Sequence, residues 1–304
     1  MSSEKVRAVQ IDRHGGPEVL EVRHVAAPRL GPGEVLVRTA ASSLNPVDWK
    51  TREWQIGDLP ATLGWDLAGT VAVSDDVRFR PGDRVIAMSA QMATKRGTWA
   101  DLVALPGDLL APAPISVRFT EAATLPLAGL TALQALEKAQ ANADDRILII
   151  GAVGGVGGLA VQLARRTGAR VDGLVSRPEH LNAARELGVE TAASDPSTLP
   201  DASYQAVLHT GGPHVTRVLA PGGRYVSITD DPLPSIPEAS TSYVEQSGEQ
   251  LAELAGLVDR GDLRLRVAAT YPVEDVRKAH EIFESGGHLG KIVITFTPDD
   301  RPPA

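Results

Sequence analysis

The sequence predicts an α/β protein in which a small β domain accompanies a doubly wound parallel sheet of the Rossmann type. Three observations support this prediction. Short β-like runs and turns fill the first 118 residues, apolar strands alternate with amphipathic helices from residue 119 onward, and a glycine-rich turn stands between a strand and a helix at Gly151 to Gly158. Strands that alternate with helices in this way form βαβ units, whose strands run parallel.

The composition is that of a globular protein, with 43% hydrophobic and 22% charged residues among 304. The formal net charge of −8 argues against a general affinity for nucleic acid or for an anionic membrane. The absence of cysteine excludes disulfides, thiolate catalysis and cysteine-ligated metals. Because the sequence has neither an apolar N-terminal segment nor an apolar run of about 18 residues, we expect a cytoplasmic protein.

Five β-like runs lie between Gly-Pro, Pro-Gly and Gly-Asp turns in the first third of the chain. Pro81-Gly82-Asp83, for example, is typical of a tight turn that leads into a strand. No helix longer than a few turns is expected before residue 119. The expected strands span residues 6–11, 19–25, 35–39, 69–73 and 84–88.

The rest of the chain alternates between helices and strands. Pro126 is placed to open the second of two helices within residues 119–140, where its missing N–H costs nothing. A strand at 146–150 precedes a helix at 155–167, whose apolar residues recur at i, i+3 and i+4. The elements expected after it are strands at residues 170–175, 205–208, 224–228 and 291–296, and helices at residues 178–187, 248–260 and 273–285.

The glycine-rich turn has the pattern Ala152-x-Gly154-x-x-Gly157. In a dinucleotide-binding turn, Gly154 lets the backbone approach a pyrophosphate, and Gly157 lets the helix pack closely on the strand. The helix begins at Gly155 and Val156, whose free N–H groups would face the phosphates. A glycine-rich turn without a ligand is the alternative, but the strand before it and the helix after it favour a nicotinamide dinucleotide.

Ser176 and Arg177 follow the second strand, where an NAD-preferring site usually has a carboxylate. The first carboxylate after the strand is Glu179. A hydroxyl and a guanidinium suit a 2′-phosphate, which Arg can hold bidentately, so NADPH is the expected cofactor. The alternative is a solvent-facing Arg177 on an ordinary loop.

The order of five motifs resembles the medium-chain dehydrogenase/reductase superfamily, and within it the zinc-independent quinone oxidoreductase and enone reductase branch. The motifs are SLNPVD at residues 43–48, GWDLAG at 64–69, PGDRV at 81–85, ATLPLAGLTALQAL at 123–136 and GAVGGVG at 151–157, and GKIVI at 290–294 fits the same branch. The resemblance implies a GroES-like substrate domain formed by residues 1–118 and 267–304. It also implies a Rossmann cofactor-binding domain at residues 119–266.

The resemblance also indicates whether a catalytic zinc is expected. By motif alignment, Asn45, Trp65 and Leu127 stand where zinc-dependent members of the superfamily have their catalytic ligands. None of these three suits a tetrahedral zinc site, so no metal is expected. The implied activity is hydride transfer from NADPH to a quinone or to an α,β-unsaturated carbonyl (enone), with donors that stabilise the developing oxyanion.

Two residues are candidates for the chemistry. By resemblance, Asn45 contacts the nicotinamide and the substrate, whereas an Asx-turn before Pro46 is the alternative. Lys50 could donate to an enolate oxygen or supply a proton, and a surface lysine is the alternative. Several family members use a tyrosine near this segment, but no tyrosine occurs here before Tyr204, so we expect Lys50 or solvent to supply the proton. The tryptophans at 49, 54 and 65 either line a substrate wall or fill the core.

The remaining implied contacts concern the cofactor and a second subunit. By resemblance, Thr131, Thr210, Gly211 and Lys291 lie at the cofactor, although Thr131 could be an ordinary helix threonine and Lys291 a lysine that opens an edge strand. Residues 239–244, from Ala239 to Val244, are expected to form the last strand of the Rossmann sheet and to pair across a homodimer, with a covered edge in a monomer as the alternative.

Two other functions stay open. An enoyl-thioester or polyketide-tailoring enoyl reductase would use the same chemistry on a carrier-bound substrate. A low-turnover NADPH-binding protein would keep the cofactor site without efficient catalysis.

Overall fold

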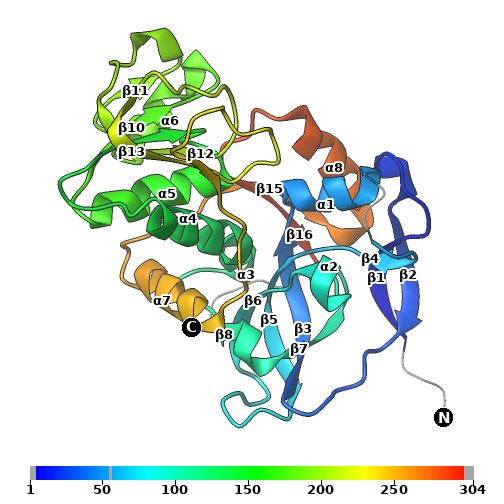
Figure 1. The fold of residues 1–304 in the computed structure, drawn as a ribbon. Helices are drawn as coiled ribbons and strands as arrows, with labels where there is room; N and C mark the ends of the chain where they lie inside the picture. Colours follow the sequence, from blue (N-terminus) through cyan, green and yellow to red (C-terminus); the bar gives the residue numbers. More distant parts are fainter. Residues whose placement is uncertain (1–4, 55–56, 298–304) are drawn as a thin grey trace. The chain divides into compact units, whose positions relative to one another are not determined.

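The computed structural model describes residues 5–54 and 57–297. The chain divides into two compact units (Figure 1). We call the first the β unit; it comprises Met1–Leu127, Gln246–Gly261 and Leu265–Ala304. We call the second the Rossmann unit; it comprises Ala128–Glu245 and Asp262–Arg264.

The Rossmann unit contains a six-stranded sheet in which every neighbouring pair is parallel, in the order β11-β10-β9-β12-β13-β14. This is the strand order of dinucleotide-binding domains, so the predicted doubly wound sheet is confirmed. The strands are β9 (Arg146–Ile150), β10 (Arg170–Leu174), β11 (Ala192–Ala193), β12 (Tyr204–His209), β13 (Leu219–Ser227) and β14 (Ala239–Thr241).

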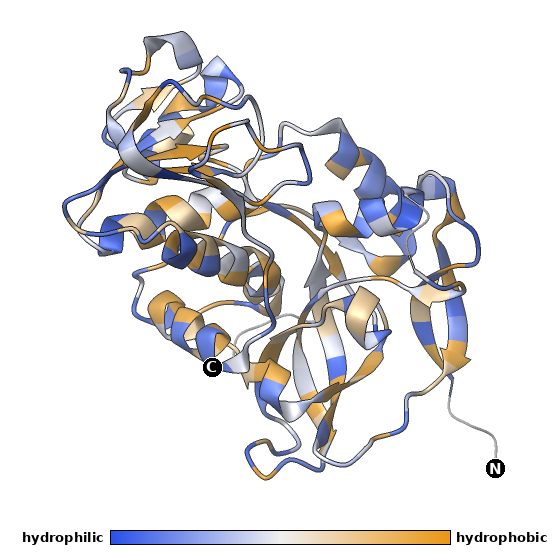
Figure 2. Cartoon of the chain, viewed as in Figure 1, coloured by the Kyte–Doolittle hydropathy of each residue, from blue (hydrophilic) through white to orange (hydrophobic). Residues whose placement is uncertain are grey.

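Three α-helices accompany this sheet: most of α4 (Pro126–Lys138), α5 (Gly155–Arg166) and α6 (Leu181–Glu186). The predicted helix at 178–187 is divided into a 3-10 turn, η3 (Pro178–His180), and α6. Ile147 to Ile150 of β9 are all buried, as expected for a strand whose two faces are covered. Figure 2 shows the hydrophobic colour concentrated along these strands.

The β unit contains a seven-stranded sheet and a three-stranded sheet. The larger runs β15-β16-β3-β5-β6-β8, with β7 also paired to β3, and the smaller runs β2-β1-β4. All of these pairs are antiparallel except β15 with β16. The strands are β1 (Lys5–Ile11), β2 (Glu21–Ala26), β3 (Glu34–Ser43), β4 (Ala61–Thr62), β5 (Asp66–Ser74), β6 (Arg84–Met88), β7 (Leu102–Pro106), β8 (Leu110–Pro112), β15 (Val267–Pro272) and β16 (Lys291–Thr295).

Two expectations about this unit need correction. Residues 19–20 do not belong to the predicted strand 19–25, because Pro17 opens a 3-10 turn, η1 (Pro17–Val19), and β2 starts only at Glu21. The prediction also assigned residues 246–261 to the Rossmann domain, whereas helix α7 (Gly248–Asp259) belongs to the β unit. Gly248 explains the close packing, since an added Cβ would lie 2.5 Å from the carbonyl oxygens of Asp108 and Leu110.

The other helices of the β unit are α1 (Pro46–Glu53), α2 (Gln91–Thr94), α3 (Phe119–Ala122) and α8 (Val276–Ser285). Helix α1 follows β3 directly, and β5 pairs with β3, which brings the ends of three elements together near Ser43. Within residues 5–54 and 57–297, no helix has both the length and the apolar character needed to cross a bilayer.

Candidate active site

The glycine-rich turn of the Rossmann unit leaves several backbone N–H groups free at the start of α5. Gly151 follows β9 with a φ of +82°, which favours glycine, and Gly154 is the N-cap of α5 without a side-chain cap. The N–H groups of Gly155, Val156 and Gly157 therefore have no hydrogen-bond acceptor among the described residues. Free N–H groups at the positive end of a helix dipole suit a phosphate.

Gly157 and Thr210 fix the shape of this turn. A Cβ added at Gly157 would lie only 2.1 Å from the carbonyl oxygen of Gly151, so no other residue fits here without moving the backbone. Thr210 follows β12, and its hydroxyl donates to the carbonyl oxygen of Ile150 at 2.8 Å. The structure thus places Thr210 and Gly211 beside Gly151, and their contact with the cofactor stays a prediction.

Arg177 and Ser176 are exposed just beyond the end of β10. Arg177 has no ion-pair partner in the part of the chain that the structure describes. The carboxylate within β10, Asp172, is occupied by Arg146 at 2.7 Å, by the Tyr204 hydroxyl at 2.8 Å and by the Thr191 N–H at 2.9 Å. The strand end therefore offers a guanidinium and a hydroxyl to a ligand.

Two histidines that sequence reasoning did not single out support the loop after Thr210. The His209 Nε2 donates to the Gly212 carbonyl oxygen at 2.9 Å, and its Nδ1 accepts from Ser227 at 3.1 Å. The His214 ring stacks on His209 with ring centroids 4.3 Å apart. Burial lowers the pKa of His209, which keeps the ring neutral and suited to this pair of bonds. A histidine directly before Thr-Gly-Gly was the signal in the sequence.

Thr131 lies within α4 in the Rossmann unit and is 7% exposed. Its predicted cofactor contact stays a prediction.

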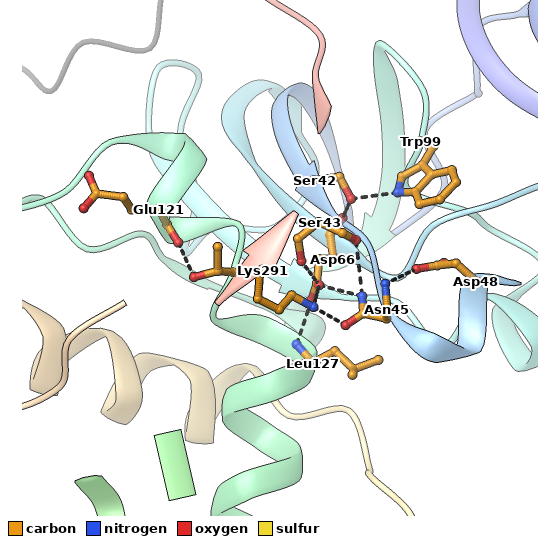
Figure 3. Close-up of polar contacts among 10 residues, drawn as sticks. Ser42, Ser43, Asn45, Asp48, Asp66, Trp99, Glu121, Leu127 and Lys291 are labelled. Carbon is orange, nitrogen blue, oxygen red and sulfur yellow. Dashed lines mark hydrogen bonds and ion pairs between the residues drawn. The ribbon is translucent and has the colours of Figure 1, made fainter. Parts of the chain in front are cut away.

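The β unit contains a second polar centre, which we call the Asn45–Asp66–Lys291 cluster (Figure 3). Asn45 precedes α1, Asp66 opens β5 and Lys291 opens β16. The Lys291 Nζ donates to the Asn45 Oδ1 and lies 3.4 Å from the Asp66 Oδ2. All three residues are buried, with Asp66 completely excluded from solvent.

The carboxylate of Asp66 accepts hydrogen bonds from three other residues. Its Oδ2 accepts from the Asn45 Nδ2 at 2.8 Å and from the Ser43 hydroxyl. Its Oδ1 accepts from the Leu127 N–H at 2.7 Å, in the first turn of α4. A helix N-terminus and an ammonium together stabilise the negative charge of a buried carboxylate.

The side chain of Asn45 is fully used inside the cluster. Its Nδ2 donates to Asp66 and, at 3.2 Å, to the Ser43 carbonyl oxygen, while its Oδ1 accepts from Lys291. Asn45 is 1% exposed. The expected contact between Asn45 and a substrate therefore stays a prediction, and the contacts present are those of a residue that orients Lys291.

Asp48 lies beside the cluster in α1. Its Oδ2 accepts from the Asn45 N–H at 2.8 Å, and its Oδ1 is buried without a partner among the described residues. Burial raises the pKa of Asp48 to about 8, and the nearby Asp66 carboxylate acts in the same direction. Burial lowers the pKa of Lys291, although Asp66 and Asp48 oppose that effect. A neutral Asp48 leaves one ammonium to balance one carboxylate.

Lys50 lies beside two tryptophan rings of the same segment. The Lys50 Nζ lies over the rings of Trp54, at 5.3 Å, and Trp49, at 5.9 Å, which are typical cation–π distances. The two indole rings meet edge to face with centroids 5.4 Å apart. The lysine that contacts Asn45 is Lys291, which the sequence assigned to the cofactor.

The donor set of the cluster does not suit zinc. Trp65 and Leu127 offer no side-chain lone pair to a metal, and the Asn45 carbonyl oxygen already accepts from an ammonium. Among residues 5–54 and 57–297, no group of three or more His, Asp or Glu is arranged to hold a metal ion.

Comparison with known proteins identifies two family domains. The alcohol dehydrogenase GroES-like domain matches residues 31–115, and the domain described as zinc-binding dehydrogenase matches residues 189–294.

Three relatives span nearly the whole chain. The NADPH-dependent alkenal/one oxidoreductase of Arabidopsis thaliana is 30% identical over 94% of this chain and 78% of its own. The spectinabilin polyketide synthase system protein NorB of Streptomyces orinoci is 33% identical over 90% of this chain but only 14% of its own. The structure of a quinone oxidoreductase from Coxiella burnetii has a TM-score of 0.85 and 28% identity, and covers 97% of this chain and 100% of its own.

Proposed function

Because the chain belongs to the quinone oxidoreductase and enone reductase branch of the medium-chain dehydrogenase/reductase superfamily, we propose that it reduces a quinone or an enone with NADPH. The chain is an oxidoreductase that uses a nicotinamide cofactor. We propose in addition that the cofactor is NADPH rather than NADH and that the acceptor is a quinone or an enone.

The observation that carries the proposal is the glycine-rich turn after β9, with its free N–H groups, together with the exposed Arg177 after the neighbouring strand β10. The N–H groups of Gly155, Val156 and Gly157 suit the pyrophosphate. Arg177, with no competing ion pair among the described residues, suits the 2′-phosphate that distinguishes NADPH from NADH.

The bound nicotinamide supplies a hydride, and the residues of the chain supply orientation and charge stabilisation. Conjugation in a quinone or enone spreads the incoming charge onto oxygen, so the protein must offer a hydrogen-bond donor there. The Asn45–Asp66–Lys291 cluster contains an ammonium held in place by two buried neighbours, Asn45 and Asp66.

Substitution of Arg177 tests the cofactor assignment. We expect Arg177→Ala to weaken NADPH binding by about 1.5–3 kcal/mol, the worth of a charge-assisted contact, and to leave NADH binding nearly unchanged. Fluorescence titration of the reduced cofactor measures both affinities. Arg170→Ala is the matched control, because Arg170 is an exposed arginine at the other end of the same strand. Equal affinity of the wild type for NADPH and NADH would contradict the assignment.

Loss of NADPH absorbance with a panel of quinones, enones and enoyl thioesters tests the reaction itself. The match to a polyketide synthase component favours an enoyl thioester as the second candidate acceptor. Turnover with an enoyl thioester alone would favour that candidate. NADPH binding without turnover on any acceptor would instead indicate a low-turnover NADPH-binding protein.

We also propose a homodimer that forms through β14. This strand stands at one end of the six-stranded sheet, and Tyr243, two residues beyond it, is 76% exposed. An edge strand with an exposed aromatic neighbour suits pairing with its twin across a two-fold axis. Light scattering coupled to size-exclusion chromatography would measure the mass, and a monomeric mass would contradict the proposal. The cytoplasmic location stays a prediction.

A further inference from the structure

We propose that Lys291 is the residue that donates a hydrogen bond to the oxygen of the acceptor, so that its ammonium stabilises the negative charge formed during hydride transfer. This inference rests on the proposed function and assigns a catalytic residue to it. It replaces two assignments made from the sequence, namely Lys50 as the donor and Lys291 as a cofactor ligand.

Lys291 is the residue of the cluster with a hydrogen-bond donor left over. Both hydrogens of the Asn45 Nδ2 are committed, to Asp66 and to the Ser43 carbonyl oxygen. The Ser43 hydroxyl is also committed to Asp66. Lys291 has three N–H donors, of which one meets the Asn45 Oδ1 and one faces the Asp66 Oδ2. No third acceptor lies within hydrogen-bond distance of its Nζ among the described residues, so one donor is left for a ligand.

Hydrogen bonds to neighbouring strands hold the backbone of Lys291 in place. The Lys291 N–H donates to the Arg266 carbonyl oxygen at 2.9 Å, and Gly290 before it has a φ of +103°. Strand β16 pairs with β3 with Val293 opposite Ser43. The same antiparallel register places Lys291 opposite Asn45, and the Leu44 N–H donates to the Ile292 carbonyl oxygen at 2.9 Å to hold it. A donor held this way needs no reorganisation when charge develops.

The electrostatics of the cluster favour the same role. Among residues 5–54 and 57–297, Asp66 is the only carboxylate that forms an ion pair with Lys291. Burial lowers the pKa of Lys291, but the contact with Asp66 favours its charged form, and in a buried setting the attraction of an ammonium for a new negative charge is much stronger than in water. The side chain of Lys291 retains 8% exposure, whereas that of Asp66 has none, so the ammonium is the more accessible of the two charged groups.

The step balances as follows for an enone. A hydride with its electron pair forms a C–H bond at the β-carbon, the C=C π electrons shift towards the carbonyl carbon, and the carbonyl π electrons move onto oxygen. The resulting enolate oxygen accepts the hydrogen bond from the Lys291 Nζ. Solvent then protonates the α-carbon, which restores the carbonyl and leaves Lys291 in its starting charge state.

The test separates this role from cofactor binding and from stability. We expect Lys291→Met to bind NADPH within twofold of the wild type and to lower kcat with an enone by at least about 100-fold, as loss of one oxyanion donor does. Lys278→Met, at an exposed lysine of α8 in the same unit, is the control that should change neither value. Lys50→Met tests the competing lysine, and a kcat that falls as far in this variant as in Lys291→Met would contradict the inference.

A second measurement does not depend on turnover. 4-Nitrophenolate is a stable oxyanion whose visible absorbance reports binding in the presence of NADP⁺. We expect the wild type to bind it at least tenfold more tightly than Lys291→Met does. If Lys291→Met does not fold, Asp66→Asn/Lys291→Met removes both charges and leaves a neutral pair, which buried sites tolerate better. The same loss of phenolate binding is expected of that double variant.

The outcomes are distinct. If the wild type oxidises NADPH with none of the acceptors, the proposed function fails, and phenolate binding still decides the role of Lys291. A folded Lys291→Met or double variant that binds the phenolate like the wild type overturns the inference. A loss of NADPH affinity as large as the loss of kcat also overturns it, because Lys291 would then be a cofactor ligand.

Discussion

Replacing Asp48 by asparagine should change the pH dependence of stability more than any other single substitution near the cluster. Asp48 is 1% exposed and its pKa is about 8, against 3.8 for an ordinary aspartate. Between these two values the folded protein holds a proton that the unfolded chain has released. The contribution of Asp48 to the free energy of unfolding must therefore fall as the pH rises from about 4 to about 8. Asparagine keeps an oxygen to accept from the Asn45 N–H and has no proton to lose.

The size of the effect follows from the interval between the two pKa values. Each pH unit between the two pKa values lowers the contribution of Asp48 to the free energy of unfolding by up to about 1.4 kcal/mol. From about pH 5 to about pH 7.5, the stability of Asp48→Asn relative to the wild type should therefore rise by at least about 2 kcal/mol. Urea unfolding followed by tryptophan fluorescence at the two pH values measures this difference.

Asp58→Asn is the matched control. Asp58 is exposed and paired with Lys95 at 2.8 Å, and that pairing lowers its pKa rather than raising it. Its substitution should give no gain in stability with rising pH. A difference between Asp48→Asn and the wild type that stays constant or shrinks over this range would show that Asp48 is ionised in the folded protein, and the charge balance assigned to the cluster would be wrong.

Two further substitutions test the Rossmann unit. Gly157→Ala places a Cβ 2.1 Å from the Gly151 carbonyl oxygen and should weaken NADPH binding at least tenfold in a fluorescence titration. Gly256→Ala in α7 is the control and should leave the affinity unchanged, because the added Cβ meets only the flexible Arg260 side chain at 3.2 Å. Tyr204→Phe removes the hydroxyl that donates to Asp172 and should lower the free energy of unfolding by about 1.5–3 kcal/mol without affecting NADPH affinity; an unchanged urea midpoint would contradict the importance of that bond.

The elements predicted best are those whose signals are local. Strand β9 was predicted with its observed limits, because an apolar run and the glycines after it define both ends. Strands β7, β8 and β15 were not predicted, since each is stabilised by partner strands elsewhere in the β unit. The amphipathic pattern of α7 predicted a helix but could not tell which unit its apolar face would cover.

In the candidate site, too, the residues with local sequence signals were predicted and those brought together by distant strands were not. The glycine-rich turn and Arg177 stand within about 30 residues of each other and could be found by motif and spacing. The contact between Lys291 and Asn45 joins residues 246 positions apart. Only the pairing of β16 with β3 brings them together, and strand register of that kind is not encoded in either short segment.

This pairing of β16 with β3 has a consequence for biosynthesis. A ribosome delivers Asn45, Asp48 and Asp66 early and Lys291 only after the Rossmann unit has been made. Until β16 emerges, the nascent β unit has the Asp66 carboxylate at this position and no ammonium to balance it. The charge that completes the cluster thus arrives with β16, so the Asn45–Asp66–Lys291 cluster is completed late in translation.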